Sequence, residues 1–223
     1  TVIDLDPQGN ASTGLGVEVE DRELSTYEFL VEGVPLEKVT METEISGLDI
    51  VPATIDLSSA DIDLISNEKR SHLLHAALRK KQPDKQEYDY VLIDCPPSLN
   101  ILTVNAMVAS HSVLIPLQSE FFALEGLSQL LLTVKEVRQT ANENLRVEGI
   151  ILTMFDGRNN LSKQVEADAR SNLRELVFKT IIPRNVRVSE APSYSMPVLT
   201  YDPSSKGSKA YMSLAKELLA NNS

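Results

Sequence analysis

Acidic side chains follow two apolar segments of this 223-residue chain, in a pattern typical of a site for a phosphate group and its metal ion. Asp4 and Asp6 follow Val2-Ile3, and Asp94 ends the apolar run 90–93. A carboxylate at the carboxyl end of a parallel strand lies where open α/β sheets bind ligands. In nucleoside triphosphatases such an acid holds Mg²⁺, which neutralises charge on the β- and γ-phosphates. These residues therefore predict a nucleotide site built on two strand ends.

The two N-terminal acids are expected to have different roles. Asp4 and Asp6 alternate along an extended strand, so only one of them can readily face a bound ligand. Asp6 is the better placed to orient an attacking water, and Asp4 is expected to support the fold or position the following loop. The alternatives are that Asp4 and Asp6 only initiate a turn, and that Asp94 only caps a helix that begins near Asn100.

Cys95 follows Asp94 directly and is the single cysteine of the chain. No histidine lies near it in the sequence, and no other group that lowers a thiol pKa is evident. We therefore interpret this side chain as a small apolar filler rather than a nucleophile. A single cysteine also excludes an internal disulfide and argues against a cysteine-based metal cluster.

The elements that must position the acids alternate between strands and helices. Apolar, β-branched segments predict strands at 1–5, 48–52, 88–94, 112–118, 147–154 and 178–182. Helical spacing predicts helices at 25–32, 56–81 (one interrupted or two consecutive), 101–109, 124–142, 161–176 and 208–221, and a glycine-rich loop is expected at 6–16. This alternation favours one α/β domain over 1–223, with a doubly wound, mostly parallel sheet and helices on both faces.

Charge is unevenly distributed along the chain, whose formal net charge is −11. Residues 1–152 hold 11 Lys and Arg against 25 Asp and Glu, whereas residues 153–223 hold 10 against 7. The total argues against a nucleic-acid partner, but the asymmetry leaves room for a modest basic face in the last third. No window approaches about 18 uninterrupted apolar residues and no cleavable leader is recognisable, so a cytoplasmic location is expected.

Four segments together resemble the ParA/Soj chromosome- and plasmid-partitioning ATPases, which belong to the deviant Walker A class. The segments are Leu5-Asp6-Pro7-Gln8-Gly9-Asn10-Ala11-Ser12, 88–99 (Tyr-Asp-Tyr-Val-Leu-Ile-Asp-Cys-Pro-Pro-Ser-Leu), 123–127 (Ala-Leu-Glu-Gly-Leu) and 182–193 (Ile-Pro-Arg-Asn-Val-Arg-Val-Ser-Glu-Ala-Pro-Ser). They occur in the family's order, and the likeness runs from residue 1 to about 219. The first two are shared across the wider class, whereas the last points to the partitioning branch.

The resemblance implies ATP and Mg²⁺ as cofactors and suggests roles for individual residues. Asp6 matches the switch acid that orients the hydrolytic water, and Asp94 matches the Walker B acid that holds magnesium through water. Pro183 and Asn185 match the segment that packs on the adenine and hydrogen-bonds to it, since an Asn amide offers both a donor and an acceptor.

The resemblance also implies macromolecular partners. Arg158 and Arg187 match arginines that contact DNA without reading its sequence, and both lie in the net-positive part of the chain; the alternative is that each is an ordinary surface charge. The family pattern further implies a homodimer with ATP between the subunits and hydrolysis stimulated by a centromere-binding ParB-type protein. A nucleoid-associated, cytoplasmic protein without membrane attachment is expected.

The sequence departs from the family at the phosphate-binding loop. Family members begin with a strand and a Lys-Gly-Gly-Val-Gly-Lys-Thr-type loop, and this sequence contains neither that motif nor any G-x-x-x-x-G-K-[ST] substitute. Gly9, Gly14 and Gly16 follow the family's second strand and are not accompanied by the lysine. We interpret the sequence as lacking the first strand, the P-loop and the first helix, and expect such a chain to be inactive and to bind ATP poorly or not at all.

Other functions remain open at this point. A MinD-like, membrane-attached septum-positioning ATPase needs a C-terminal helix with an apolar face and a basic rim. An apolar stripe is present at Tyr211, Leu214, Ala215, Leu218 and Leu219. Only Lys209 and Lys216 are basic there, which favours docking of the helix on the core. A non-catalytic interaction protein without a P-loop is the other alternative.

Overall fold

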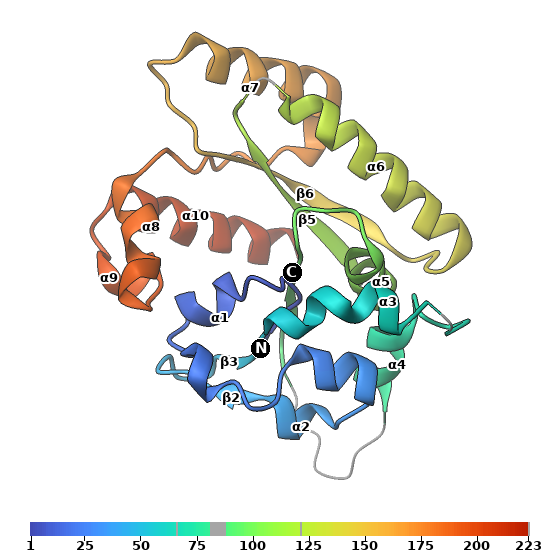
Figure 1. The fold of residues 1–223 in the computed structure, drawn as a ribbon. Coiled ribbons are helices and arrows are strands. Elements are labelled where there is room, and N and C mark those ends of the chain that lie inside the picture. The colour runs from blue at the N-terminus through green and yellow to red at the C-terminus, as the bar shows by residue number, and fades with distance from the viewer. Residues whose placement is uncertain (66, 81–87, 121, 223) are drawn as a thin grey trace. The chain divides into compact units, whose positions relative to one another are not determined.

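The computed structural model describes residues 1–65, 67–80, 88–120 and 122–222. Their backbone contacts define two compact units: unit 1 comprises Thr1–Ser110 with Pro192–Met196, and unit 2 comprises His111–Ala191 with Pro197–Ser223. Each unit contains strands and helices of its own (Figure 1). A single domain over 1–223 stays a prediction.

Unit 1 is built on a four-stranded sheet with the strand order β2-β3-β1-β4. The strands are β1 (Val2–Asp4), β2 (Met41–Glu42), β3 (Asp49–Val51) and β4 (Leu92–Asp94). The central strand β1 is parallel to β3 and β4, and only the short edge strand β2 is antiparallel to its neighbour. The sequence predicts three of these strands but misses β2, and it places the start of β4 four residues too early.

Short helices cover this sheet, and none of the described helices in unit 1 is longer than nine residues. They are α1 (Asn10–Gly14), η1 (Val19–Asp21), the π-helical turn η2 (Glu28–Glu32), α2 (Leu36–Val39), η3 (Ile55–Ser59), α3 (Ala60–Asp63), α4 (Leu73–Arg79) and α5 (Ile101–Ala109). The core forms where the helices meet β1 and β3, and its fully buried members include Ile3, Leu5, Phe29, Val51 and Leu74.

Two stretches of unit 1, predicted as helix and as loop, match these predictions only in part. The helical structure predicted over 56–81, as one interrupted helix or two consecutive ones, is divided among η3, α3 and α4, and residues 66 and 81 of this stretch lie outside the described residues. The stretch 6–16 is not loop throughout, because α1 forms within it. This helix is too short to show a hydrophobic period, and a buried carboxylate described below fixes its first turn.

Unit 2 is built on two parallel strands, β5 (Ser112–Gln118) and β6 (Arg146–Thr153). Its helices are α6 (Ala123–Thr140), α7 (Asn160–Leu173), η4 (Arg174–Leu176), α8 (Val186–Glu190), α9 (Val198–Tyr201) and α10 (Lys206–Asn221), and η5 (Ala191–Tyr194) lies where the chain passes between the units. The long helices α6 and α7 lie side by side (Figure 1). Side-chain caps mark two of these helix starts: Asn159 accepts the Leu161 N–H at α7, and Ser205 accepts the Ser208 N–H at α10.

The strand predicted over 178–182 is wrong. The peptide N–H groups of Lys179 and Thr180 donate to the two carboxylate oxygens of Glu217 in α10, at 2.7 and 2.9 Å. Because a side chain takes these donors, the segment bonds to β6 only near its two ends, where the Phe178 N–H donates to the Ile150 carbonyl and the Ile182 N–H donates to the Leu152 carbonyl, each at 2.9 Å.

The C-terminal helix α10 packs on the core of unit 2. Leu214 is 7% exposed and lies in a cluster with Ile151, Phe178 and Ile182, against which Tyr211 and Leu218 also pack. The expectation that this helix docks on the core is therefore confirmed, although Ala215 and Leu219 of the predicted stripe are exposed. Among the described helices, none combines the length and the hydropathy needed to span a membrane.

Candidate functional site

The pairing of β1 with β4 brings two of the predicted acids together. Asp4 and Asp94 are direct partners in this parallel ladder, and the Leu5 N–H donates to the Asp94 carbonyl at 2.8 Å. The strands run in the same direction, so both carboxyl ends reach the same edge of the sheet.

Asp4 is completely buried, and its carboxylate organises the loop that follows β1. Its Oδ1 accepts the Asp6 N–H at 3.1 Å, and its Oδ2 accepts the N–H and the hydroxyl of Ser12 at 2.9 and 2.7 Å. Both oxygens are thus used within the protein, as the interpretation of Asp4 as a loop-positioning residue requires.

Asp6 is half-buried and begins a turn. Its Oδ1 accepts the Gln8 N–H at 3.0 Å, and its carbonyl accepts the Gly9 N–H at 2.9 Å. The turn-initiating alternative is therefore correct for Asp6 as a local description. Its Oδ2, however, makes no hydrogen bond with any described residue, so this oxygen remains able to accept a hydrogen bond from a donor such as water.

Asp94 lies in an electrostatically unfavourable place. Burial, and next the nearby carboxylates of Asp4 and Asp6, raise the pKa of Asp94 to about 6. Asp94 does not cap the following helix, because Asn100 does so: its Oδ1 accepts the N–H groups of Leu102 and Thr103. The capping alternative for Asp94 is therefore wrong.

The acids at the end of β1 and β4 fit a hard cation. Mg²⁺ prefers oxygen ligands and is commonly held by one or two carboxylates together with waters and phosphate oxygens. Among the described residues, no group of three side chains is arranged to chelate a metal. Magnesium held at Asp94 through water, with the remaining ligands from a nucleotide, suits this donor set.

Cys95 is not a nucleophile at neutral pH. Burial, and next the charge of Asp94, raise the pKa of the Cys95 thiol to about 12. The thiol therefore stays protonated, in agreement with the interpretation of Cys95 as a filler.

The residues assigned to adenine lie in unit 2. Pro183 forms one of the isolated bridges, and Asn185 caps α8 by accepting the Arg187 N–H at 3.0 Å on its Oδ1. The Nδ2 donor of Asn185 makes no hydrogen bond with a described residue. One lone pair of the amide oxygen is thus occupied, and its donor remains available to a ring nitrogen of a base.

The two arginines assigned to DNA are on the surface of unit 2, and each faces a carboxylate. The Arg158 side chain is 92% exposed and binds Asp156 through Nε and Nη2, at 3.0 and 2.8 Å. This contact lowers the pKa of Asp156 to about 2. Arg187 pairs with Glu190 at 2.9 Å and with Asp202 at 3.4 Å. A phosphate group would have to compete with these acids for either guanidinium.

Ser12 and Arg22, two of the buried polar residues of unit 1, support the site and are not predicted from the sequence. Ser12 links Asp4 to the Ala53 N–H, which donates to its Oγ at 3.0 Å. One signal was available for Arg22, since it is one of only two basic residues among the first sixty.

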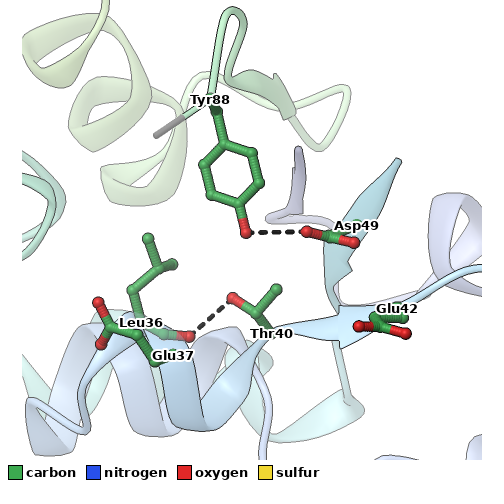
Figure 2. Close-up of a pocket in the computed structure, with 6 residues that line it drawn as sticks. All are labelled: Leu36, Glu37, Thr40, Glu42, Asp49 and Tyr88. Atoms are coloured by element: carbon green, nitrogen blue, oxygen red, sulfur yellow. Dashed lines mark hydrogen bonds between the residues drawn. The ribbon is translucent and has the colours of Figure 1, made fainter. Parts of the chain in front are cut away.

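A cavity of about 180 Å³ lies at another place in unit 1 (Figure 2). It is lined by Leu36, Glu37, Thr40, Glu42, Asp49 and Tyr88. The Tyr88 hydroxyl donates to Asp49 at 3.0 Å, and burial followed by Asp49 raises the Tyr88 pKa to about 12. Asp49 begins a strand parallel to the one that Asp4 ends, so the cavity is at the opposite end of the sheet. It is also smaller than the roughly 300 Å³ at which ligand pockets begin.

Comparisons with known proteins point to one group. The model of a family described as an AAA domain matches residues 1–147. The sporulation initiation inhibitor protein Soj of Bacillus subtilis is 49% identical over 220 residues, which cover 99% of this chain and 86% of that protein. The chromosome partitioning protein ParA of Caulobacter vibrioides is 50% identical over 219 residues, covering 98% of this chain and 82% of that protein.

Solved structures agree on the fold. Cobyrinic acid a,c-diamide synthase from Mycobacterium smegmatis, solved with bound ADP and magnesium, has a TM-score of 0.80 and 35% identity, over 98% of this chain and 80% of that one. The cell division ATPase MinD of Pyrococcus furiosus, at 22% identity, has a TM-score of 0.77 over 98% of this chain and 85% of that one. The predicted fold class, an α/β protein of the P-loop NTPase type with a mostly parallel sheet, is confirmed.

Proposed function

The chain belongs to the ParA/Soj family of partitioning ATPases, and from this premise we propose that it is a Mg²⁺-dependent ATPase acting in chromosome or plasmid partitioning. ATP binding promotes a homodimer that binds DNA without sequence preference, and a ParB-type partner stimulates the hydrolysis that ends this state. The observation that carries the proposal is the cluster of Asp4, Asp6 and Asp94 where β1 and β4 end.

The three acids divide the work in this proposal. Asp94 would hold magnesium through water, and the ion would supply positive charge to neutralise the phosphates. The free Oδ2 of Asp6 accepts a hydrogen bond from the attacking water and so orients the water. Asp4 does not touch the nucleotide, since both its oxygens already hold the loop. Oriented acceptors of this kind act by positioning rather than by covalent chemistry.

ATP hydrolysis also needs a phosphate-binding loop, and the printed sequence contains no such motif. Among the described strands β4 pairs only with β1. Its first residue, Leu92, is 55% exposed, and Tyr90 and Val91 just before it are 52% and 41% exposed. An apolar strand with a bare edge is suited to a further parallel partner. We propose that a strand outside the printed residues pairs there and brings the loop beside Asp94, and that the printed residues alone bind ATP weakly.

The residues of unit 2 complete the proposal. Pro183 packs on the adenine and the Nδ2 of Asn185 donates to it. Arg158 and Arg187 contact DNA phosphates, which accounts for sequence-independent binding and for a cytoplasmic protein associated with the nucleoid. Docking of α10 on the unit 2 core gives no support to the MinD-like alternative, which needs that apolar face for lipid.

Steady-state ATP hydrolysis tests the proposal. Two proteins are assayed: the 223-residue chain, and the same chain extended by a family-type phosphate-loop segment ahead of Thr1. Both are assayed with Mg²⁺, DNA and a ParB-type partner. We expect the extended protein to hydrolyse ATP, and Asp6→Asn and Asp94→Asn each to lower its turnover at least tenfold. The exposed Glu20 of unit 1 offers a matched control, and Glu20→Gln leaves turnover unchanged. Failure of the extended protein to bind ATP would overturn the proposal.

A further inference from the structure

Arg22 is a buried cation whose hydrogen bonds all go to neutral acceptors. Only 8% of the residue is exposed. Its Nε and Nη2 donate to the Val17 carbonyl at 3.3 and 2.7 Å, its Nη1 donates to the Ala53 carbonyl at 3.0 Å, and its Nη2 also donates to Thr13 Oγ1 at 2.8 Å. Within the described part of the chain, no carboxylate forms an ion pair with it. Burial of a charge without a counter-charge is costly, so these bonds must hold something the protein needs.

The bonds of Arg22 complete a network around α1. Both backbone polar groups of Ala53 are bound: its carbonyl accepts from Arg22 and its N–H donates to the Ser12 Oγ. Ser12 in turn donates to Asp4, and Asp4 accepts the N–H of Asp6. The loop that carries Asp6 is therefore fixed by Asp4 at its beginning and by Arg22 further on.

The turn at Gly9 shows how closely Arg22 approaches this loop. Gly9 has φ +64°, and a Cβ atom added there would collide with the Arg22 Nη1. The Gly9 N–H donates to the Asp6 carbonyl and closes the turn that begins at Asp6. The guanidinium thus lies against the turn, in space that only glycine leaves open.

We propose that Arg22 is a positioning residue for the hydrolysis assigned above: it holds the loop from Gly9 to Val17 against Ala53 and thereby fixes where the Asp6 carboxylate lies. The inference rests on the proposed function of Asp6. The role needs a guanidinium, because donors must reach three acceptors in different directions; a lysine ammonium presents its donors from one point.

Two substitutions test this, each with a matched control. Arg22→Met removes the donors and the charge, and Arg22→Lys keeps the charge if the first variant does not fold. The exposed Arg79 of α4 provides the controls Arg79→Met and Arg79→Lys. In the phosphate-loop-extended protein we expect either Arg22 variant to lower kcat at least tenfold while KM for ATP stays within twofold. The two Arg79 controls should change neither kcat nor KM.

Amide hydrogen exchange on the 223-residue chain distinguishes a local effect on the loop from a general loss of stability. This measurement does not depend on ATP hydrolysis. We expect at least tenfold faster exchange at Gly9, Ser12 and Thr13 in Arg22→Lys, with no change at Ile3 in the sheet. Equal acceleration at Ile3, or unchanged exchange throughout the loop, would overturn the positioning role. If the unsubstituted protein hydrolyses no ATP, the proposed function fails, and the exchange data still decide whether Arg22 fixes the loop.

Discussion

Replacement of Ser12 by alanine is expected to destabilise unit 1. Ser12 is completely buried, and its Oγ donates to the Asp4 carboxylate at 2.7 Å and accepts the Ala53 N–H at 3.0 Å. Ser12→Ala removes both bonds with almost no change in volume. A buried carboxylate then loses a donor, and a buried peptide N–H loses its acceptor.

The size of the effect follows from these two losses. A hydrogen bond to a charged group contributes about 1.5–3 kcal/mol, and an unsatisfied buried donor costs about 1–3 kcal/mol. The Ser12 N–H continues to donate to Asp4, which limits the damage. We therefore expect Ser12→Ala to lower the free energy of unfolding of unit 1 by about 3 kcal/mol, because partial relaxation offsets some of the sum.

Urea denaturation followed by hydrogen exchange of the β1 and β3 amides measures this free energy for unit 1 alone. Ser46, an exposed serine of unit 1, is the matched control. Ser46→Ala should change the free energy of unfolding of unit 1 by less than about 0.5 kcal/mol. A loss in Ser12→Ala no larger than in the control would refute the conclusion that Ser12 and Asp4 hold the loop.

Three further outcomes are expected. The pKa of Asp94 is raised from 3.8 to about 6, so its contribution is fully present below the unfolded pKa and is lost as the pH rises through 6. Asp94→Asn should accordingly be more stable than the parent at pH 7.5 by about 1–2 kcal/mol, and no more stable at pH 3.5. This is half of the roughly 3 kcal/mol that two pKa units represent, because solvent screens this partly exposed group. Urea denaturation at both pH values checks this, and a destabilised variant at pH 7.5 would contradict it. Arg158→Ala should weaken DNA binding at every sequence and reduce the slope of log K against log salt concentration by about 1, whereas Asp156→Asn, which frees Arg158, should strengthen DNA binding. Fluorescence anisotropy across a salt series measures both variants. Unchanged binding in both would contradict a contact between Arg158 and DNA. Cys95, with a thiol pKa of about 12, should react with a disulfide reagent at pH 8 far more slowly than free cysteine, and reaction at the free rate would contradict its burial.

The fold could be predicted where apolar residues and helix caps act locally. The limits of β5 are those read from the sequence, and α5 begins after Asn100, whose side chain caps it. The segment 178–182 looks like a strand by composition, but the Glu217 side chain of a distant helix takes two of its N–H groups. No local pattern encodes that competition.

The candidate site was predictable for the acids and not for their supports. Asp94 and Asp6 follow apolar strands, so their place at the sheet edge follows from sequence order. Ser12 and Arg22 act through backbone groups of Ala53, more than thirty residues away. Hydrogen bonds to backbone groups far away in the sequence produce no recognisable residue spacing. For this reason the sequence predicts only a glycine-rich loop at 6–16.

The nucleotide site at the ends of β1 and β4 is tested most directly by titrating the ¹⁵N-labelled, phosphate-loop-extended protein with Mg²⁺ and a non-hydrolysable ATP analogue. In unit 1 we expect the largest amide shifts at Asp6, at Gly9, whose N–H donates to the Asp6 carbonyl, and at Cys95, which follows Asp94. These shifts should be lost in Asp94→Asn. Shifts confined to residues 36–49 around the cavity, or no shifts at saturating nucleotide, would contradict this placement of the site.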